Sequence, residues 1–490
     1  MTLSVKVRSL SVAVVLLALL SHAAPAAEKG AKIPITTSSE EARAAFIKGR
    51  DLFEKLRFAD SRTEFERAVE LDPSFGIALQ SLANTQPTAR QFNEVLARAV
   101  AVADKVSPGE RLLILASDAA GHGDNTEQIR LLKELADLYP DDERAQTQYG
   151  NAFFATQEWA KAVVALEAAT KINPSYSQPY NQLGYSYKFL GKLDRAEAAF
   201  KKYVALIPDD PNPYDSYAEL LLKRGRYQES ITNYQKALAL DANFPSAHYG
   251  IATDYDLLHQ PAKARAQLET ALSLAKDDGQ RRGALFALTV TDAHAGDLAA
   301  ARQDIDKQYD LSVATRDTLN MIGDRVLLGT LALETGDVAG AEQAFTAARE
   351  MVEGTASIPE LNRANQRRFQ KFLQGRLALA KNDMSGARRW SDEFAAEANA
   401  SGSAGQKRLV HELAGQVALA QKDYAKAIAE LEQSNLLDPY NLYRLSVAHS
   451  GAGHAAKARE YAEKARQDNT LTSLNYAFVL RALAGSNKSM

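Results

Sequence analysis

The chain has 490 residues, a formal net charge of −3 and no cysteine, and 46% of its residues are hydrophobic. The apolar fraction is typical of a folded protein, and the balanced charge argues against nucleic-acid binding, which depends on clustered lysine and arginine. The lack of cysteine excludes disulfides, thiol nucleophiles and a lipid anchor attached to cysteine.

The N-terminus has the pattern of a secretory signal peptide. Lys6 and Arg8 precede an apolar run over residues 12–20, and the small residues 24–26 suit a cleavage site. A membrane anchor is the alternative, but it needs about 20 apolar residues. The run is shorter, because His22 and an Ala/Pro segment follow it.

We therefore expect residues 1–26 to be a signal peptide that is cleaved after Ala26. The mature protein would be periplasmic or secreted, without stable insertion in the membrane. We expect residues 27–41 to form a flexible N-terminal segment.

Equivalent residues recur every 34 positions in the middle of the chain. The recurring sets are Gly150 and Gly184, then Ala162 and Ala196, then Pro140, Pro174 and Pro208. A fixed period of this length indicates a stacked supersecondary unit, because one such unit cannot bury its own apolar face.

Each unit has the pattern of a helical hairpin. Its two helical faces are formed by Leu183, Tyr187 and Leu190 and by Ala196, Phe200 and Tyr203. Gly184 is small where the two helices must cross closely. Pro208 ends the second helix, because proline lacks an N–H and clashes with the preceding turn.

At these residues the chain resembles the tetratricopeptide repeat family. The family's small residue, alanine, aromatic or leucine, and proline are matched in several units, as in Gly49, Phe65, Ala68 and Pro73, in Gly150, Ala162, Leu166, Ala169 and Pro174, and in Gly415, Ala427, Leu431 and Pro439. The resemblance implies an all-α fold. Its form would be an α-solenoid, a right-handed superhelix of about twelve hairpins with a C-terminal capping helix.

The spacing suggests a division of this solenoid. We expect an N-terminal array over residues 42–281, a divergent C-terminal array over 282–475, and a capping helix and tail over 476–490. The spacing stretches at 276–283, 350–367 and 399–406. These joints indicate either two sub-arrays that meet at an angle near residue 280 or 355, or longer loops with unchanged stacking.

No motif for catalysis or metal binding is present. His411 and Glu412 begin like a zinc-protease helix, but Gly415 stands where the second histidine is needed. His449 and His454 are five residues apart, which gives poor facing geometry on a helix. We therefore expect no enzymatic activity, no metal and no cofactor.

The resemblance implies that the first helix of each hairpin lines a concave face and meets the ligand there. The predicted ligand-binding residues are Gln148, Asn151, Asn181, Tyr185, Lys188, Asp215, Glu219, Tyr249 and Asp256, with Arg144 and Thr253 beside them. An asparagine can hydrogen-bond both polar groups of a peptide backbone, and tyrosine offers flat contact area. The alternative is that these residues are simply solvated, and Tyr149, Tyr187, Tyr217 and Tyr234 fall at packing positions.

These features favour a non-enzymatic scaffold of the cell envelope that binds a protein or peptide on its concave face. The alternative is a factor that binds or assembles cell-wall glycan or exported polysaccharide through acidic and aromatic groove residues. A third hypothesis is self-association into a homo-oligomer through the C-terminal hairpins. No nucleic-acid partner is expected.

Overall fold

The computed structural model describes residues 30–86, 89–356, 358, 360–470 and 474–486. Within these ranges the chain forms 25 α-helices and one short 3₁₀ helix, Ala103–Lys105, and it contains no strand. The predicted all-α class is confirmed. The expected signal peptide lies outside the described residues.

The helices follow one another with short connections throughout the described chain. The first fourteen are α1 (Glu40–Glu54), α2 (Phe58–Leu71), α3 (Gly76–Ala83), α4 (Ala89–Ala101), α5 (Pro108–Gly121), α6 (Asn125–Leu138), α7 (Glu143–Ala155), α8 (Trp159–Ile172), α9 (Gln178–Phe189), α10 (Leu193–Leu206), α11 (Pro211–Lys223), α12 (Tyr227–Leu240), α13 (Pro245–Leu257) and α14 (Pro261–Leu274). We call them the first array.

The remaining helices form the second array. They are α15 (Asp278–Ala295), α16 (Leu298–Ala314), α17 (Thr318–Glu334), α18 (Val338–Gly354), α19 (Glu360–Ala380), α20 (Met384–Ala400), α21 (Ala404–Ala420), α22 (Tyr424–Leu431), α23 (Pro439–Gly451), α24 (Ala455–Arg466) and α25 (Leu474–Ser486).

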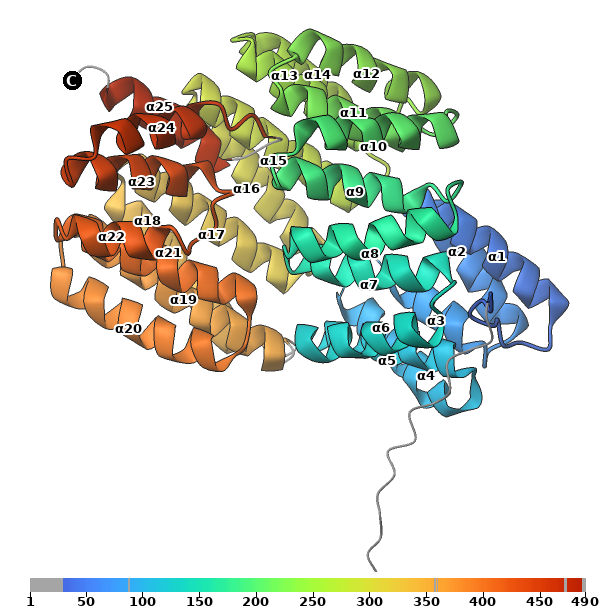
Figure 1. Ribbon diagram of the computed structural model, residues 1–490. Coiled ribbons are helices and arrows are strands. Elements are labelled where there is room, and N and C mark those ends of the chain that lie inside the picture. Colours follow the sequence, from blue (N-terminus) through green and yellow to red (C-terminus); the bar gives the residue numbers. More distant parts are fainter. Residues whose placement is uncertain (1–29, 87–88, 357, 359, 471–473, 487–490) are drawn as a thin grey trace, which may run out of the picture.

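Consecutive helices pair into twelve hairpins, from α1/α2 to α23/α24, and α25 follows the last one. Each hairpin packs against the next, and the first helices of several neighbours also touch, as α7 touches α9 and α13 touches α15. Figure 1 shows the first array on the right and the second on the left. The expected solenoid of about twelve hairpins and a final helix is confirmed.

A small residue in the first helix of a hairpin lets the large residue of the second helix approach closely. A Cβ atom placed on Gly184 would lie 2.5 Å from the Phe200 ring, which is fully buried. The same contact recurs in other hairpins, in the pairs Gly150/Leu166, Gly329/Phe345 and Gly415/Leu431. The 34-residue period therefore reflects this crossing.

The stretched spacing of the second array comes from longer helices. Helices α5 to α14 have 12–14 residues each, whereas α16 to α21 have 17–21. The alternative of longer loops was therefore wrong, because the extra residues extend the flanking helices. The expected boundary between residues 281 and 282 falls inside α15, which packs on both α13 and α14.

The segment before α1 is held in place over its described part, contrary to the expected flexibility of residues 27–41. The backbone N–H of Ile33 donates to Asp142 at 2.9 Å, and that of Thr36 donates to Glu110 at 2.8 Å. These carboxylates lie at the N-terminal ends of α7 and α5. We call this segment the strap. Its residues 31–37 have no regular secondary structure and pass the two helix ends, where these carboxylates accept their N–H groups.

Helix α25 does more than cover the end of the solenoid. It packs on α23 and α24 of the last hairpin, as expected of a capping helix, but it also packs on α15 at the start of the second array. Figure 1 shows these first and last parts of the second array beside each other. Tyr440 on α23 also donates to Glu334 on α17 at 2.6 Å. The second array therefore closes on itself.

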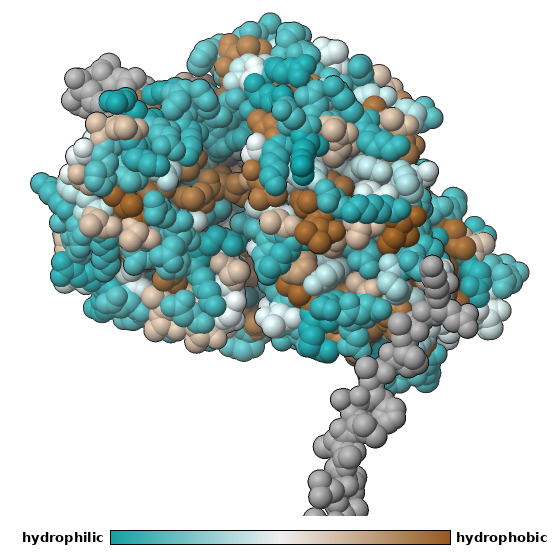
Figure 2. Space-filling model, in the orientation of Figure 1, coloured by the Kyte–Doolittle hydropathy of each residue, from teal (hydrophilic) through white to brown (hydrophobic). Residues whose placement is uncertain are grey.

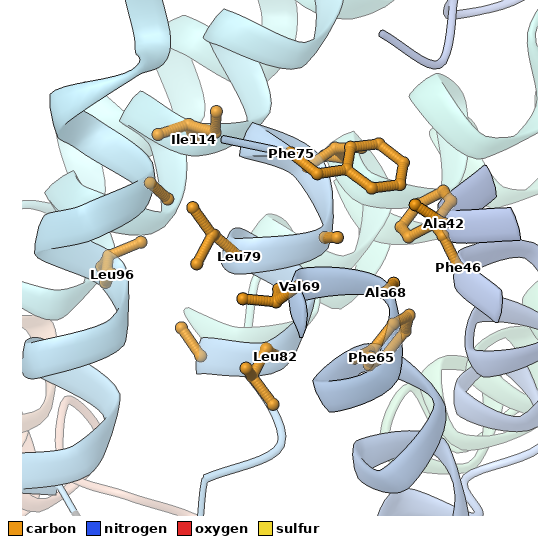
Figure 3. Packing of buried hydrophobic residues seen from close by; sticks show 14 of the residues in the cluster. Ala42, Phe46, Phe65, Ala68, Val69, Phe75, Leu79, Leu82, Leu96 and Ile114 are labelled. Carbon is orange, nitrogen blue, oxygen red and sulfur yellow. The ribbon is translucent and has the colours of Figure 1, made fainter. Parts of the chain in front are cut away.

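Buried apolar residues form a series of local clusters along the solenoid. In the first hairpins Phe46 lies between Phe65 and Phe75, with ring centroids 5.8 and 5.2 Å away (Figure 3). A stack with many small cores is stabilised by contacts between neighbours. This cluster fixes α1 against α2 and α3, which carry part of the site described below.

We predict that Gly184→Leu destabilises the first array. The added side chain would overlap the Phe200 ring, and overpacking of this kind costs about 2–3 kcal/mol in the free energy of unfolding. Ala198→Leu on the exposed side of α10 is the matched control and should change little. Chemical denaturation of the three chains measures the difference, and equal stability of the two variants would contradict the assigned crossing.

Candidate functional site

Several predicted concave-face residues bind the neighbouring hairpin. The hydroxyl of Tyr185 on α9 donates to Glu219 on α11 at 2.8 Å, and Lys188 on α9 forms an ion pair with the same carboxylate. The Lys188 ammonium also lies 4.7 Å from the centre of the Tyr185 ring. These three side chains therefore join α9 to α11 and have partners within the chain.

Asn181, Asp215 and Asp256 are buried, contrary to the expectation that they face a ligand. Their exposed fractions are 5%, 7% and 7%. The physical reason is that the first helices of successive hairpins stack closely enough to cover them. Burial, with the nearby charge of Glu219, raises the pKa of Asp215 well above its usual range.

The C-terminal end of the predicted groove is covered by the chain itself. Tyr249, Thr253 and Asp256 line a pocket of only about 20 Å³, together with Thr470 and Tyr476 from the C-terminal part. A single water molecule needs about 10–15 Å³ of such a cavity. The pocket therefore has no room for a peptide.

An open pocket lies at the other end, on the inner side of the first five hairpins. We call it the inner pocket; its volume is about 140 Å³. Of the predicted residues, Gln148 lines it, together with Arg144, whereas Asn151 is half-buried and is not part of its lining. Its other lining residues are Lys32, Ile33, Pro34 and Ile35 from the strap, Phe46, Arg50, Phe53 and Glu54 from α1, and Phe65, Ile77, Gln80, Ser81, Asn84, Leu113, Asp142, Tyr176 and Gln178.

Two arginines meet one carboxylate in the inner pocket. Glu54 accepts two hydrogen bonds from Arg144, at 2.6 and 3.0 Å, whereas the Nε of Arg50 lies 3.9 Å from Glu54. The Nε of Arg50 is buried without a hydrogen-bond partner, and 27% of this side chain is exposed. Arg50 is thus ion-paired with Glu54 but donates no hydrogen bond through its Nε, and this N–H is left for an oxygen atom of a ligand.

Aromatic rings surround these charges. The Arg50 guanidinium lies 5.9 Å from the centre of the Phe46 ring, and that of Arg144 lies 5.1 Å from the Tyr176 ring. The Tyr176 hydroxyl donates to Gln178 at 2.5 Å. The pocket thus combines an apolar floor with a few fixed polar groups, as ligand sites commonly do.

Arg50 and Glu54 are not among the residues predicted to bind a ligand, although one feature of the sequence pointed to Arg50. Arg50 follows the small residue Gly49, just as Asn151 follows Gly150. Arg50 therefore occupies the same position of the repeat as the predicted ligand-binding residue Asn151. Glu54 follows one turn later. What the repeat could not reveal is that Arg144 of α7 reaches Glu54 of α1, three hairpins earlier in the chain.

Two histidines meet at the turn between α23 and α24, contrary to the expected poor geometry. The Nδ1 atoms of His449 and His454 are 3.2 Å apart, because the turn folds the rings together. Burial and the neighbouring His454 lower the pKa of His449. Among the described residues, no group of three or more histidine, aspartate or glutamate side chains could hold a metal ion.

We predict that the stability of the first array falls as the pH rises. Burial raises the pKa of Asp254 to about 8 and that of Asp256 to about 7. Between the unfolded value near 3.9 and these folded values, the folded chain keeps protons that the unfolded chain has lost. The free energy of unfolding should therefore decrease from about pH 4 to about pH 8 and level off above that.

Asp254→Asn tests this assignment, because the amide stays neutral at every pH. Denaturation between pH 5 and pH 9 should show a shallower decrease for this variant than for the unchanged chain. Asp194→Asn is the control, since Asp194 is almost fully exposed. Identical slopes for Asp254→Asn and the unchanged chain would contradict the assignment.

Two family models match the chain within the first array. A model of the TPR repeat matches residues 150–191 and 218–253, and a model of the tetratricopeptide repeat matches residues 177–210. These matches fall on hairpins α7 to α13, where the 34-residue period is regular.

Curated relatives carry the same repeats. Anaphase-promoting complex subunit 3 of Schizosaccharomyces pombe is 24% identical over 237 residues, which are 47% of this chain and 35% of that protein. Small glutamine-rich tetratricopeptide repeat-containing protein 2 of Mycosarcoma maydis is 24% identical over 128 residues, 26% of this chain and 36% of that protein. The matches thus span about a third of the length of these relatives.

The crystal structure of a thermophilic TPR protein from Thermus thermophilus covers 44% of this chain and 99% of its own, with 24% identity and a TM-score of 0.30. Repeat matches in the first array agree with the stacked hairpins of the fold. The chain therefore carries tetratricopeptide repeats, which the family models match within the first array.

Proposed function

We propose that this protein is a non-enzymatic scaffold of the cell envelope that holds an extended segment of a partner protein in the inner pocket. Repeats of this family generally serve protein interaction. The observation that carries the proposal is the Arg50 guanidinium, which lies in the inner pocket with its Nε unbonded.

The chemistry of the inner pocket indicates what the segment presents. Arg50 suits an acidic side chain or a carbonyl oxygen, since hydrogen bonds to a charged group are stronger than neutral ones. Phe46 and Phe53 would contact an apolar side chain next to that oxygen. The amides of Asn84 and Gln148 can pair with a backbone, which supplies both donors and acceptors.

The strap favours an extended ligand. Its residues 32–35 line one wall of the inner pocket, and exposed and half-buried residues alternate along it, as they do along an extended chain. A partner segment in the same conformation would lie beside it and use the opposite wall. The floor then receives alternate side chains of that segment.

The glycan hypothesis has less support. It depends on Tyr185 and Asp215 as groove residues, but the Tyr185 hydroxyl is bonded to Glu219 and Asp215 is buried. A sugar would have to separate α9 from α11 to reach them. We therefore favour a protein partner.

The envelope location rests on the basic residues, the apolar run and the small residues at the N-terminus. In the described part of the chain no helix has the length and hydropathy needed to cross a bilayer.

We predict that Arg50→Gln weakens partner binding by about tenfold or more, because a hydrogen bond to a charged group contributes about 1.5–3 kcal/mol. A photo-crosslinking amino acid at Gln148 in living cells should yield a discrete adduct with the partner. Arg50→Gln should remove most of this adduct.

Arg57→Gln is the matched control, because Arg57 is half-exposed, pairs with Asp60 and lies outside the inner pocket. A crosslinker at exposed Lys202 on α10 controls for random collisions. Equal adducts from positions 148 and 202, or an adduct that survives Arg50→Gln, would refute the proposed site.

We predict that Leu17→Arg prevents export, because a charge in the apolar run opposes membrane insertion of a signal peptide. The unchanged chain should be recovered from the envelope fraction with Ala27 as its first residue. Fractionation and N-terminal sequencing measure both points. Recovery of the uncleaved chain from the cytoplasm would disprove the location.

A further inference from the structure

A pocket lies in the second array between α16 and α18, the second helices of two successive hairpins, with α17 as its floor. We call it the outer pocket. Its volume is about 280 Å³, against about 140 Å³ for the inner pocket. The lining residues belong to these three helices and to the N-cap of α18, and no other segment of the described chain fills the space.

The outer pocket uses a different side of α17 from the inner surface. Arg325, Leu328 and Ala332 line the pocket at positions i, i+3 and i+7, which share one face of a helix. Val326 and Thr330, on the opposite side of α17, line a separate hollow together with residues of α15. The outer pocket is therefore distinct from the surface that the first helices form.

Two arginines without a carboxylate partner line the outer pocket. Within the described chain neither Arg302 nor Arg325 forms an ion pair or a side-chain hydrogen bond. Arg282 and Arg376 of the same array, by contrast, pair with Asp324 and Glu334. The N–H groups of a guanidinium match the oxygen atoms of a carboxylate or a phosphate. The outer pocket therefore offers strong donors to an anion.

An aromatic ring holds Arg325 in position. Its guanidinium carbon lies 3.7 Å from the centre of the Tyr309 ring on α16, and the side chain is half-buried. Such stacking uses the flat face of the guanidinium and leaves the N–H groups at its edge for other partners. A side chain that is already fixed loses less freedom when a ligand binds. Arg325 is therefore the main contact for an anion, and the exposed Arg302 is the weaker one.

The rest of the wall is mostly apolar. It is formed by Leu328 and Ala332 of α17 and by Ala344, Ala347 and Met351 of α18. On the face of the molecule that Figure 2 shows, most of the surface is hydrophilic. An apolar group attached to the anion would be removed from water in this pocket, and the flexible methionine adapts to its shape.

The polar groups of the lining favour a small anion over a peptide. Asp337 is the one acid among the described lining residues, and its carboxylate accepts the backbone N–H of Gly340 at 2.9 Å as the cap of α18. The two arginines outnumber it. Gln343 is the one amide side chain of this lining, so an extended peptide backbone would find few partners.

We propose that the outer pocket binds a small amphiphilic anion, a carboxylate or phosphate joined to an apolar chain. The anionic group lies against Arg325 and Arg302, and the apolar chain lies along α17 and α18. A free acyl carboxylate and an anionic lipid both present this chemistry. The site is independent of the extended partner segment proposed for the inner pocket.

Decanoate, below the concentration at which it forms micelles, is the probe, and calorimetry of the full chain should show saturable binding. Arg325→Gln should weaken this binding at least about tenfold, because it removes hydrogen bonds to a charged group. Arg349→Gln is the matched control, since Arg349 is an exposed arginine of α18 outside the pocket lining. This control should bind decanoate as the unchanged chain does.

The apolar part of the site has its own test. Ala347→Leu fills part of the wall and should weaken decanoate binding as well. If this variant does not fold, decanol and inorganic phosphate replace it, and each should bind more weakly than decanoate because each lacks one part of the ligand. Unaltered decanoate binding by a folded Ala347→Leu chain, or phosphate binding as tight as that of decanoate, would overturn the amphiphilic assignment.

Vesicles identify the source of the anion. Flotation with phosphatidylglycerol vesicles but not with phosphatidylcholine vesicles, lost in Arg325→Gln, would support the site with a lipid as its ligand. Decanoate binding without flotation would support it with a free ligand. No decanoate binding, or equal binding by Arg325→Gln and the unchanged chain, would overturn the proposal. A glutamate-rich peptide that binds where decanoate does not would make an acidic protein segment the ligand and overturn it as well.

Discussion

The close crossing of two helices at a small residue is the contact on which this structure depends. At Gly184 the absence of a side chain lets Phe200 lie directly against the α9 backbone, and the same contact recurs in other hairpins. Each hairpin keeps an apolar surface that only the next hairpin can cover. The solenoid, its curvature and its inner surface all follow from repeating this contact.

Stacking of this kind has a consequence for the inner surface. Where successive first helices touch, the polar residues between them bind one another, as Tyr185 binds Glu219 and Asp256 accepts from Thr291. Where first helices are not packed on each other, as with α1 and α7, a pocket remains that contains an arginine Nε without a hydrogen bond. Ligand access is therefore decided by the distance between first helices, although polar residues continue through both regions.

The chain uses its own segments on its inner and end surfaces. The strap lines the inner pocket and is bound by carboxylates at helix ends, and α25 packs between α15 and the last hairpin of the second array. One segment is held by backbone hydrogen bonds and the other by apolar packing. These two occupants correspond to the two ways in which such surfaces recognise peptides, as an extended chain and as a helix.

The sequence by itself determined the helical hairpins, their approximate number and the small residue at several crossings, because these are local features that repeat every 34 residues in the middle of the chain. Even Arg50 could be placed from its position after Gly49. The partners of Glu54, the burial of Asp215 and the position of α25 were decided only by the tertiary structure. The repeated residues determine how one hairpin packs on the next. The small rotations between hairpins add up along the solenoid and decide which distant helices meet. This total rotation cannot be derived from the residues of any single repeat.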